Sequence, residues 1–322
     1  MAILARAEGP LLQQVLDASF GIWHDGLDRQ GYSRWYAAQL ATSWGRTHLD
    51  RWALVDREEV QASAKIYTFD AVLDGRPIRI AGVGAVFTQP AHRRRGAARE
   101  LLTRLLDRAA ADGVDAALLF SEIGADYYAR LGFEVVPTRN LAVRVIEDAR
   151  RGAPATMVRA GDERDLADIV AMDAARAAPY RFHLTRDRDL VQFALVKRRL
   201  LAGLAPPGAR ALQFFVAEEG ASAVAYVVLA AKGSDWTIDS CGDRDPSGAR
   251  LGAILQVLIA RDPGERRPTL TGWIPASLRP PQLEITEAAS SHVMMMRALS
   301  DRGLPGHALG ADDVLYWAAD WF

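Results

Sequence analysis

The sequence predicts an α/β protein of two domains, each a mixed, mostly antiparallel sheet flanked by helices. Short β-branched stretches alternate with stretches of helical apolar period, which is the pattern of an α/β chain. The 322 residues are enough for two separate cores. A charged and then Gly- and Pro-bearing stretch at 147–154 separates two halves with a similar order of elements. We therefore expect domains at 1–150 and 155–322.

Composition excludes several classes of protein. Lys and Arg number 39 against 40 Asp and Glu, which argues against a nucleic-acid binder held by bulk charge. Cys241 is the one cysteine, so an internal disulfide is impossible and a reducing compartment is favoured. No apolar run is long enough to span a bilayer, and 1–6 lacks an apolar segment of secretory length. We expect a cytoplasmic protein without a membrane partner.

The first half opens with helical patterns and continues with strands. An apolar face of helical period runs from Leu11 to Phe20, and a second helix is expected from Ser33, as N-cap, to Leu40. Asp74-Gly75 marks a hairpin turn. After the core strand at 80–88, a helix with an apolar stripe is expected at 98–109. The expected strands are 51–55, 61–70, 80–88, 118–121, 134–136 and 141–145.

The second half repeats this style. Acidic residues begin a helix at 162–170, and another helix is expected at 189–204. A third, at 250–261, has an apolar face of leucine and isoleucine. The expected strands are 157–160, 213–218, 223–231, 236–241, 269–274 and 293–297.

The joint between the strand at 80–88 and the helix at 98–109 is the most informative stretch. It reads Arg93-Arg94-Arg95-Gly96-Ala97-Ala98. A helix N-terminus has unpaired N–H groups and a positive dipole end, and both attract phosphate. Glycine and alanine allow close approach to the backbone, and the arginines add fixed charge. A plain solvated surface turn is the alternative reading of the same residues.

Two motifs in this region resemble a known family. Arg93-x-x-Gly96-x-Ala98 resembles the acyl-CoA pyrophosphate loop, (Arg/Gln)-x-x-Gly-x-(Gly/Ala), of the GNAT superfamily of N-acetyltransferases. The stretch Tyr127-Tyr128-Ala129-Arg130-Leu131-Gly132-Phe133 is similar to that family's Phe-Tyr-x-x-x-Gly-Phe helix and turn. The resemblance covers about 80–137 and implies acetyl-CoA as co-substrate. The similar order of elements in the second half suggests a second GNAT-like domain there.

The family's cofactor contacts carry over to matching positions. The resemblance implies that a sheet splaying beside the core strand exposes backbone groups to the pantetheine arm. It also implies that the loop surrounds the pyrophosphate mainly through N–H groups. The implied cofactor-binding residues are Val86, Phe87, Thr88, Arg93, Arg94, Arg95, Gly96, Ala97, Ala98 and Arg99.

The same resemblance suggests the catalytic groups. A tyrosine at the position of Tyr128 would donate a proton to the leaving thiolate, while Tyr127 packs inward. Alternatively, Tyr128 packs in the core or only bonds the sulfur. Three bases are open: Glu122 at a strand end, His92, which we expect to face solvent, and the terminal carboxylate of Phe322. The apolar ending could equally be held against the second domain's core.

The acceptor is expected to be a small primary amine: an amino acid, an aminoglycoside or a polyamine. In the family, the first two helices form one wall of the acceptor site, although aromatic residues there are also ordinary core residues. The implied substrate-binding residues are Trp23, His24, Asp25, Tyr32, Trp35 and Tyr36. No histidine or cysteine spacing suggests a metal site. A homo-oligomer is left open.

The second half departs from the family at its own loop. Gly242-Asp243-Arg244-Asp245-Pro246-Ser247-Gly248-Ala249 carries aspartates that would repel a pyrophosphate. We therefore expect a degenerate GNAT-like domain that supports the fold and shapes the acceptor site. The tandem resembles acetyltransferases of the enhanced-intracellular-survival type, and the step at Ser121–Gly124 resembles fungal lysine N-acetyltransferases. The rival reading is a CoA- or small-molecule-binding regulatory module without turnover.

Overall fold

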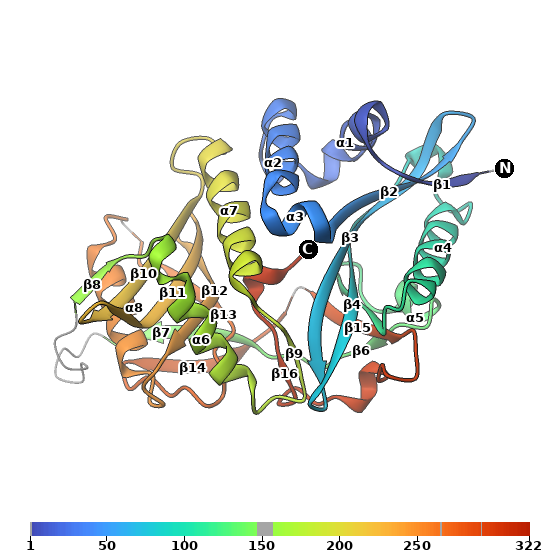
Figure 1. Cartoon of the computed structure of the whole chain (residues 1–322). Helices are drawn as coiled ribbons and strands as arrows, with labels where there is room; N and C mark the ends of the chain where they lie inside the picture. The colour runs from blue at the N-terminus through green and yellow to red at the C-terminus, as the bar shows by residue number, and fades with distance from the viewer. Residues whose placement is uncertain (1, 147–156, 265, 291) are drawn as a thin grey trace.

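The computed structural model describes residues 2–146, 157–264, 266–290 and 292–322, which form two sheets side by side (Figure 1). The domain boundary expected at 147–154 lies outside the described residues. Both sheets are mostly antiparallel and carry helices, as the sequence predicts for this fold class. No helix in the described part is long and apolar enough to cross a membrane.

The first sheet has nine strands. Its main path runs β1-β2-β3-β4-β5-β15-β6, with β9 beside β3 and β16 beside β9. The members that come early in the chain are β1 (Ile3–Arg6), β2 (Leu49–Asp56), β3 (Glu59–Leu73), β4 (Arg76–Thr88), β5 (Ala116–Ser121) and β6 (Glu134–Val135). The later members are β9 (Phe182–Leu184), β15 (Val293–Ala298) and β16 (Val314–Leu315). The strand β1 was not expected from the sequence.

Helices cover the first sheet on both faces (Figure 1). One face packs against α1 (Gly9–Trp23), α2 (Arg29–Ala41) and α3 (Ser43–His48), while the other packs against α4 (Ala97–Ala111) and α5 (Asp126–Ala129). The alternation of side chains along β3 agrees with this arrangement. Tyr67 and Phe69 pack with residues of α1–α3, whereas Ala62 and Ala64 pack with residues of α4.

The predicted start of the second helix was wrong. Ser33 lies inside α2, and the N-cap is Asp28, whose carboxylate accepts a hydrogen bond from the Gly31 amide at 2.6 Å. Asp and Ser are both good N-caps, so cap preference alone does not decide where the helix begins. The burial of the side chains in its first turns decides. Here Tyr32 and the other aromatic residues after Asp28 are already buried, and their packing extends the helix to that point.

The second sheet has seven strands in the order β14-β7-β13-β12-β11-β10-β8. They are β7 (Asn140–Val145), β8 (Met157–Ala160), β10 (Ala211–Glu219), β11 (Ser222–Lys232), β12 (Asp235–Asp243), β13 (Thr269–Gly272) and β14 (Leu283–Ala288). Its helices are α6 (Leu166–Ala177), α7 (Arg188–Leu204) and α8 (Ala249–Arg261). The α7 helix also contacts α2 and α3 of the first half.

The two halves exchange a strand. The strand β7, which follows β6 in the chain, leaves the first sheet and pairs with β13 and β14 of the second. In return, β15 enters the first sheet between β5 and β6, with Met295 opposite both Leu119 and Val135. Met294, Met295 and Met296 are almost fully buried there. Each sheet therefore contains strands from both halves of the chain: β7 of the first half lies in the second sheet, and β9, β15 and β16 of the second half lie in the first.

This exchange makes the first half dependent on the second. We expect residues 2–146 expressed alone to lack a cooperative thermal unfolding transition. Without β15, β5 and β6 would have unpaired edges and would expose apolar side chains that the whole chain buries. Circular dichroism and size-exclusion chromatography measure this. Co-expression with 157–322 is the control and should restore a cooperative complex. A 2–146 fragment that unfolds cooperatively by itself would contradict the dependence.

Candidate active site

The loop before α4 leaves a helix N-terminus open. The chain passes from β4 through a short 3-10 turn at Pro90–His92 to Gly96, which caps α4 at a φ of +86°. The amides of Ala97, Ala98 and Arg99 make no hydrogen bond within the described residues. No atom lies within 4 Å of where a Gly96 side chain would begin. The loop therefore has unpaired N–H groups at the positive end of a helix dipole.

The arginines around this terminus have no acidic partners. Arg93, Arg94, Arg95 and Arg99 make no ion pair with any carboxylate of the described residues. Arg93 donates from Nε to the Thr88 carbonyl at 3.3 Å. Arg94 has a φ of +60°, a left-handed conformation that costs a residue with a side chain about 1–2 kcal/mol. Backbone strain and uncompensated positive charge are both common features of loops that bind anions.

The corresponding loop of the second half is already filled. Gly248 caps α8 at a φ of +73°, as Gly96 caps α4. However, the Asp243 carboxylate accepts hydrogen bonds from the amides of Arg250 at 2.9 Å and Leu251 at 3.0 Å. Burial raises the pKa of Asp243. A carboxylate of the chain thus takes the place that a phosphate would need at this helix.

The sheet splays beside the first loop. Parallel pairing of β4 with β5 runs from Ile80 to Val83, opposite Ala116 to Leu119, and then stops. Beyond this point a β-bulge includes Ala85 at a φ of +45°. Phe87 and Thr88 pair only with β3, so this length of β4 has one edge without a strand partner. Such an edge can receive an extended ligand through main-chain hydrogen bonds.

The last residues of the sequence lie at the splay. A methyl group on Gly84 would come within 2.5 Å of the backbone carbonyl carbon of Phe322. The Phe322 ring packs on Tyr67 and Phe69, with centroids 5.3 and 5.6 Å apart. Trp317 belongs to the second core, whereas Phe322 packs against the first. The tail thus crosses from one half of the molecule to the other.

Lys197 of α7 holds this tail. Its Nζ donates to the Trp321 carbonyl at 2.5 Å, and its own carbonyl accepts from Nε1 of Trp35 at 2.9 Å. Burial, with Arg198 next to it, lowers the pKa of Lys197 to about 7. The α7 helix therefore connects the C-terminal residues to α2.

Tyr128 lies on α5, beyond the end of β5. It is almost fully buried and packs edge-on against Tyr127 and Phe133. Burial, with the charge of Glu122 as a smaller cause, raises the pKa of Tyr128 to about 12. The phenol is therefore protonated at neutral pH and can donate a hydrogen bond.

Glu122 faces a histidine that the sequence did not indicate. Nε2 of His292 lies 3.2 Å from Oε1 of Glu122, and the His292 ring packs on Trp321 with centroids 4.8 Å apart. His92, by contrast, pairs with Glu59 at 3.1 Å. His292 and Glu122 are each next to a strand, but only the β5–β15 pairing brings them together. To predict this contact from the sequence, one would need to know that β15 pairs with β5 and in which register.

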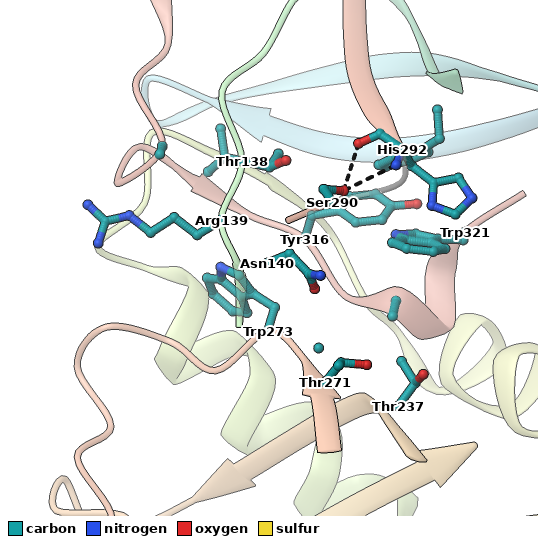
Figure 2. A pocket seen from close by; sticks show the side chains of 15 residues that line it. Thr138, Arg139, Asn140, Thr237, Thr271, Trp273, Ser290, His292, Tyr316 and Trp321 are labelled. Carbon is teal, nitrogen blue, oxygen red and sulfur yellow. Dashed lines mark hydrogen bonds between the residues drawn. The ribbon is translucent and has the colours of Figure 1, made fainter. Parts of the chain in front are cut away.

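A cavity of about 260 Å³ opens beside Trp321 and His292 (Figure 2). It lies between the halves, and its lining comes from β5, the connection into β7, β12, β13 and the C-terminal segment. Ser290 exchanges hydrogen bonds with the His292 backbone at its edge. No group of three or more His, Cys, Asp or Glu residues placed to hold a metal occurs in the described part of the chain.

Comparison with known proteins identifies the first half. The family model described as "Acetyltransferase (GNAT) domain" matches residues 16–136. These residues form a GNAT acetyltransferase domain. The protein is accordingly an acetyltransferase that uses an acyl-CoA as co-substrate.

Solved structures share the fold of the whole chain at low identity. A GCN5-related N-acetyltransferase from Anabaena variabilis has a TM-score of 0.69 at 12% identity, with 93% of this chain and 73% of that chain covered. Eis1 from Mycobacterium abscessus has a TM-score of 0.57 at 16% identity, with 93% of this chain and 74% of that chain covered. N-myristoyltransferase from Saccharomyces cerevisiae with bound myristoyl-CoA has a TM-score of 0.53 at 8% identity, with 92% of this chain and 82% of that chain covered. No curated protein sequence matches significantly.

The acceptor residues expected from the resemblance lie on α1, α2 and their connection. Tyr32 and Tyr36 are fully buried, and Trp35 nearly so, whereas Trp23 and His24 are half-buried. Asp25 is exposed and pairs with Arg210 at 3.0 Å. None of these six residues lines the cavity of Figure 2.

Three buried basic side chains lie next to α2. Arg51, Lys65 and Lys197 are each less than a tenth exposed and make no ion pair with a carboxylate of the described residues. The Lys65 ammonium lies over the rings of Trp35 and Tyr36, at 5.3 and 5.2 Å. Burial, with Arg51 and Lys197 nearby, lowers the pKa of Lys65 well below its ordinary value. Lys65 therefore gives up its proton more readily than an exposed lysine and contributes less positive charge to this region.

The pKa of Lys197 predicts a pH-dependent stability. Its pKa is about 7 in the folded state against an ordinary 10.5. Between these values the unfolded chain binds a proton that the folded chain lacks, so the free energy of unfolding rises with pH. From pH 7 to 8.5 the expected rise from this group is up to about 2 kcal/mol.

Urea unfolding at several pH values measures this rise. Lys197→Met should reduce it, and Lys232→Met, at an exposed lysine, should leave it unchanged. An equal pH dependence in wild type and Lys197→Met would show that Lys197 keeps its ordinary pKa.

Proposed function

We propose that this acetyltransferase moves an acetyl group from acetyl-CoA to the primary amine of a small molecule by direct attack on the thioester. The observation that supports it most is the open N-terminus of α4, with four unpaired arginines, beside the splayed edge of β4. In this proposal the α4 amides hold the pyrophosphate, and the backbone of Val86, Phe87 and Thr88 holds the pantetheine.

Tyr128 is the proposed general acid. When the amine attacks, negative charge develops first on the carbonyl oxygen and then on the sulfur. A buried phenol that stays protonated up to about pH 12 can donate to that sulfur throughout the neutral range. Tyr127, its half-buried neighbour, packs edge-on against it and provides a matched control.

Tyr128→Phe should lower kcat about 10²–10⁴-fold while the Kd for acetyl-CoA stays unchanged, because only the proton donor is lost. Steady-state kinetics with a panel of amines and calorimetry with acetyl-CoA measure the two quantities. Tyr127→Phe should keep kcat within a few-fold. Equal losses in the two variants would remove Tyr128 from the mechanism. Binding of acetyl-CoA without turnover on any amine would favour the regulatory-module alternative.

The proposed base is the α-carboxylate of Phe322, in a chain that ends at this residue. Its backbone lies against Gly84 at the splay, and Lys197 fixes the preceding carbonyl. Glu122 is more exposed than Phe322 and already has His292 as a partner. A carboxylate held beside the acyl group can take the proton directly or through one water.

Two variants separate these bases. Adding two glycines after Phe322 moves the carboxylate and should lower kcat at least about 10²-fold, whereas Glu122→Gln should lower it less than about tenfold. Stopped assays at saturating acetyl-CoA across pH 6–9 give kcat and its pH profile for both. A larger loss in Glu122→Gln than in the extended chain would assign the base to Glu122.

A further inference from the structure

The cavity of Figure 2 connects to the reaction centre through a short series of contacts. Trp321 and His292 form its wall, and Trp321 directly precedes Phe322 at the splay. His292 meets Glu122, and the Glu122 charge acts on Tyr128. Phe120, which also lines the cavity, packs on Phe322 with ring centroids 5.6 Å apart. A molecule in the cavity is therefore one residue from the proposed base, and His292 and Glu122 connect it to the proposed acid.

The cavity is electrically neutral. No aspartate or glutamate is among its lining residues. Arg139 is among the lining residues but is paired with Asp312 at 3.0 Å and Glu287 at 3.7 Å. His292 has Glu122 as its partner. A polyamine or an aminoglycoside would find no carboxylates for its several charges here, and a free amino acid would find no unpaired cation for its carboxylate.

The lining instead combines hydroxyl groups with ring faces (Figure 2). The hydroxyls of Thr138, Thr237 and Thr271 make no hydrogen bond within the described residues and can each donate and accept one. Asn140 uses its amide nitrogen on the Ala289 carbonyl at 2.9 Å, which leaves its side-chain oxygen as an acceptor. The aromatic lining residues are Phe120, Trp273, Tyr316 and Trp321.

We propose that this cavity holds the body of the acceptor, and that the acceptor is a primary amine on an uncharged, hydroxyl-bearing ring, as in an amino sugar. The inference rests on the proposed N-acetyltransferase function and names its substrate class. Aromatic faces cover the apolar side of such a ring, and threonine hydroxyls and an amide oxygen bond its hydroxyl groups. The volume, about 260 Å³, suits one ring and not a larger oligosaccharide.

The chemistry at the open end of the cavity fits the transfer. The ring's amine would point past Trp321 toward the splay, lose a proton to the proposed base and attack the thioester carbonyl carbon. The new C–N bond replaces the C–S bond, and the thiolate leaves with the proton of Tyr128.

The first test compares acceptors. Initial rates with acetyl-CoA are measured for glucosamine, spermidine, kanamycin and L-lysine, and the proposal expects glucosamine to have the highest kcat/KM. Thr271→Val removes one hydroxyl at constant volume and should raise the KM for glucosamine about tenfold, with the KM for acetyl-CoA unchanged. Thr103→Val, on the exposed face of α4, is the control and should change neither.

A binding measurement keeps this test separate from that of the proposed function. Calorimetry with glucosamine should give a Kd for wild type that Trp273→Ala and Thr271→Val each weaken about tenfold or more, whether or not turnover occurs. Preferred acetylation of spermidine, kanamycin or lysine would overturn the substrate class but leave the N-acetyltransferase function intact. Failure of glucosamine to bind wild type, or equal binding by all variants, would overturn the proposed use of the cavity.

Discussion

The structure depends on how two helix N-termini satisfy their free amides. A helix leaves its first N–H groups without partners, and the two halves of this chain meet that requirement in opposite ways. At α8 the Asp243 carboxylate accepts from two of these amides, so the terminus is complete without a ligand. At α4 the glycine-capped loop has no such carboxylate and is surrounded by arginines instead. We therefore assign the proposed binding of the anionic co-substrate to the first half, while the second half contributes packing and part of the wall of a cavity.

The strand exchange explains why the second half is nevertheless part of the site. The strand β15 brings His292 to the end of β5, and the segment after β16 carries Trp321 and Phe322 onto the first sheet. Lys197 on α7 then fixes the tail from the other side. A site divided in this way can form only when both halves are folded, because the groups around the proposed thioester position come from distant parts of the chain.

Local features of the chain were predictable, and distant contacts were not. Gly96 before an apolar helix and after a β-branched strand predicted the open α4 terminus, and Asp243 predicted the loss of that feature in the second half. The helix start at Ser33 was wrong because tertiary packing, not cap preference, selected Asp28. Neither the exchange of β7 and β15 nor the contact between His292 and Glu122 has a local signature. Both depend on strand register across more than a hundred residues.

The central claim, that only the α4 terminus binds the co-substrate, is tested most directly by calorimetric titration with acetyl-CoA. Gly96 and Gly248 occupy equivalent left-handed cap positions, and valine is placed at each. A side chain at 248, unlike one at 96, would lie 3.0 Å from Pro280, so the folding of both variants is checked by thermal unfolding. The account predicts one acetyl-CoA per wild-type chain, binding weakened at least about tenfold in Gly96→Val by blocked approach to the amides, and unchanged binding in folded Gly248→Val. Two bound molecules per chain, or full binding in Gly96→Val, would contradict it.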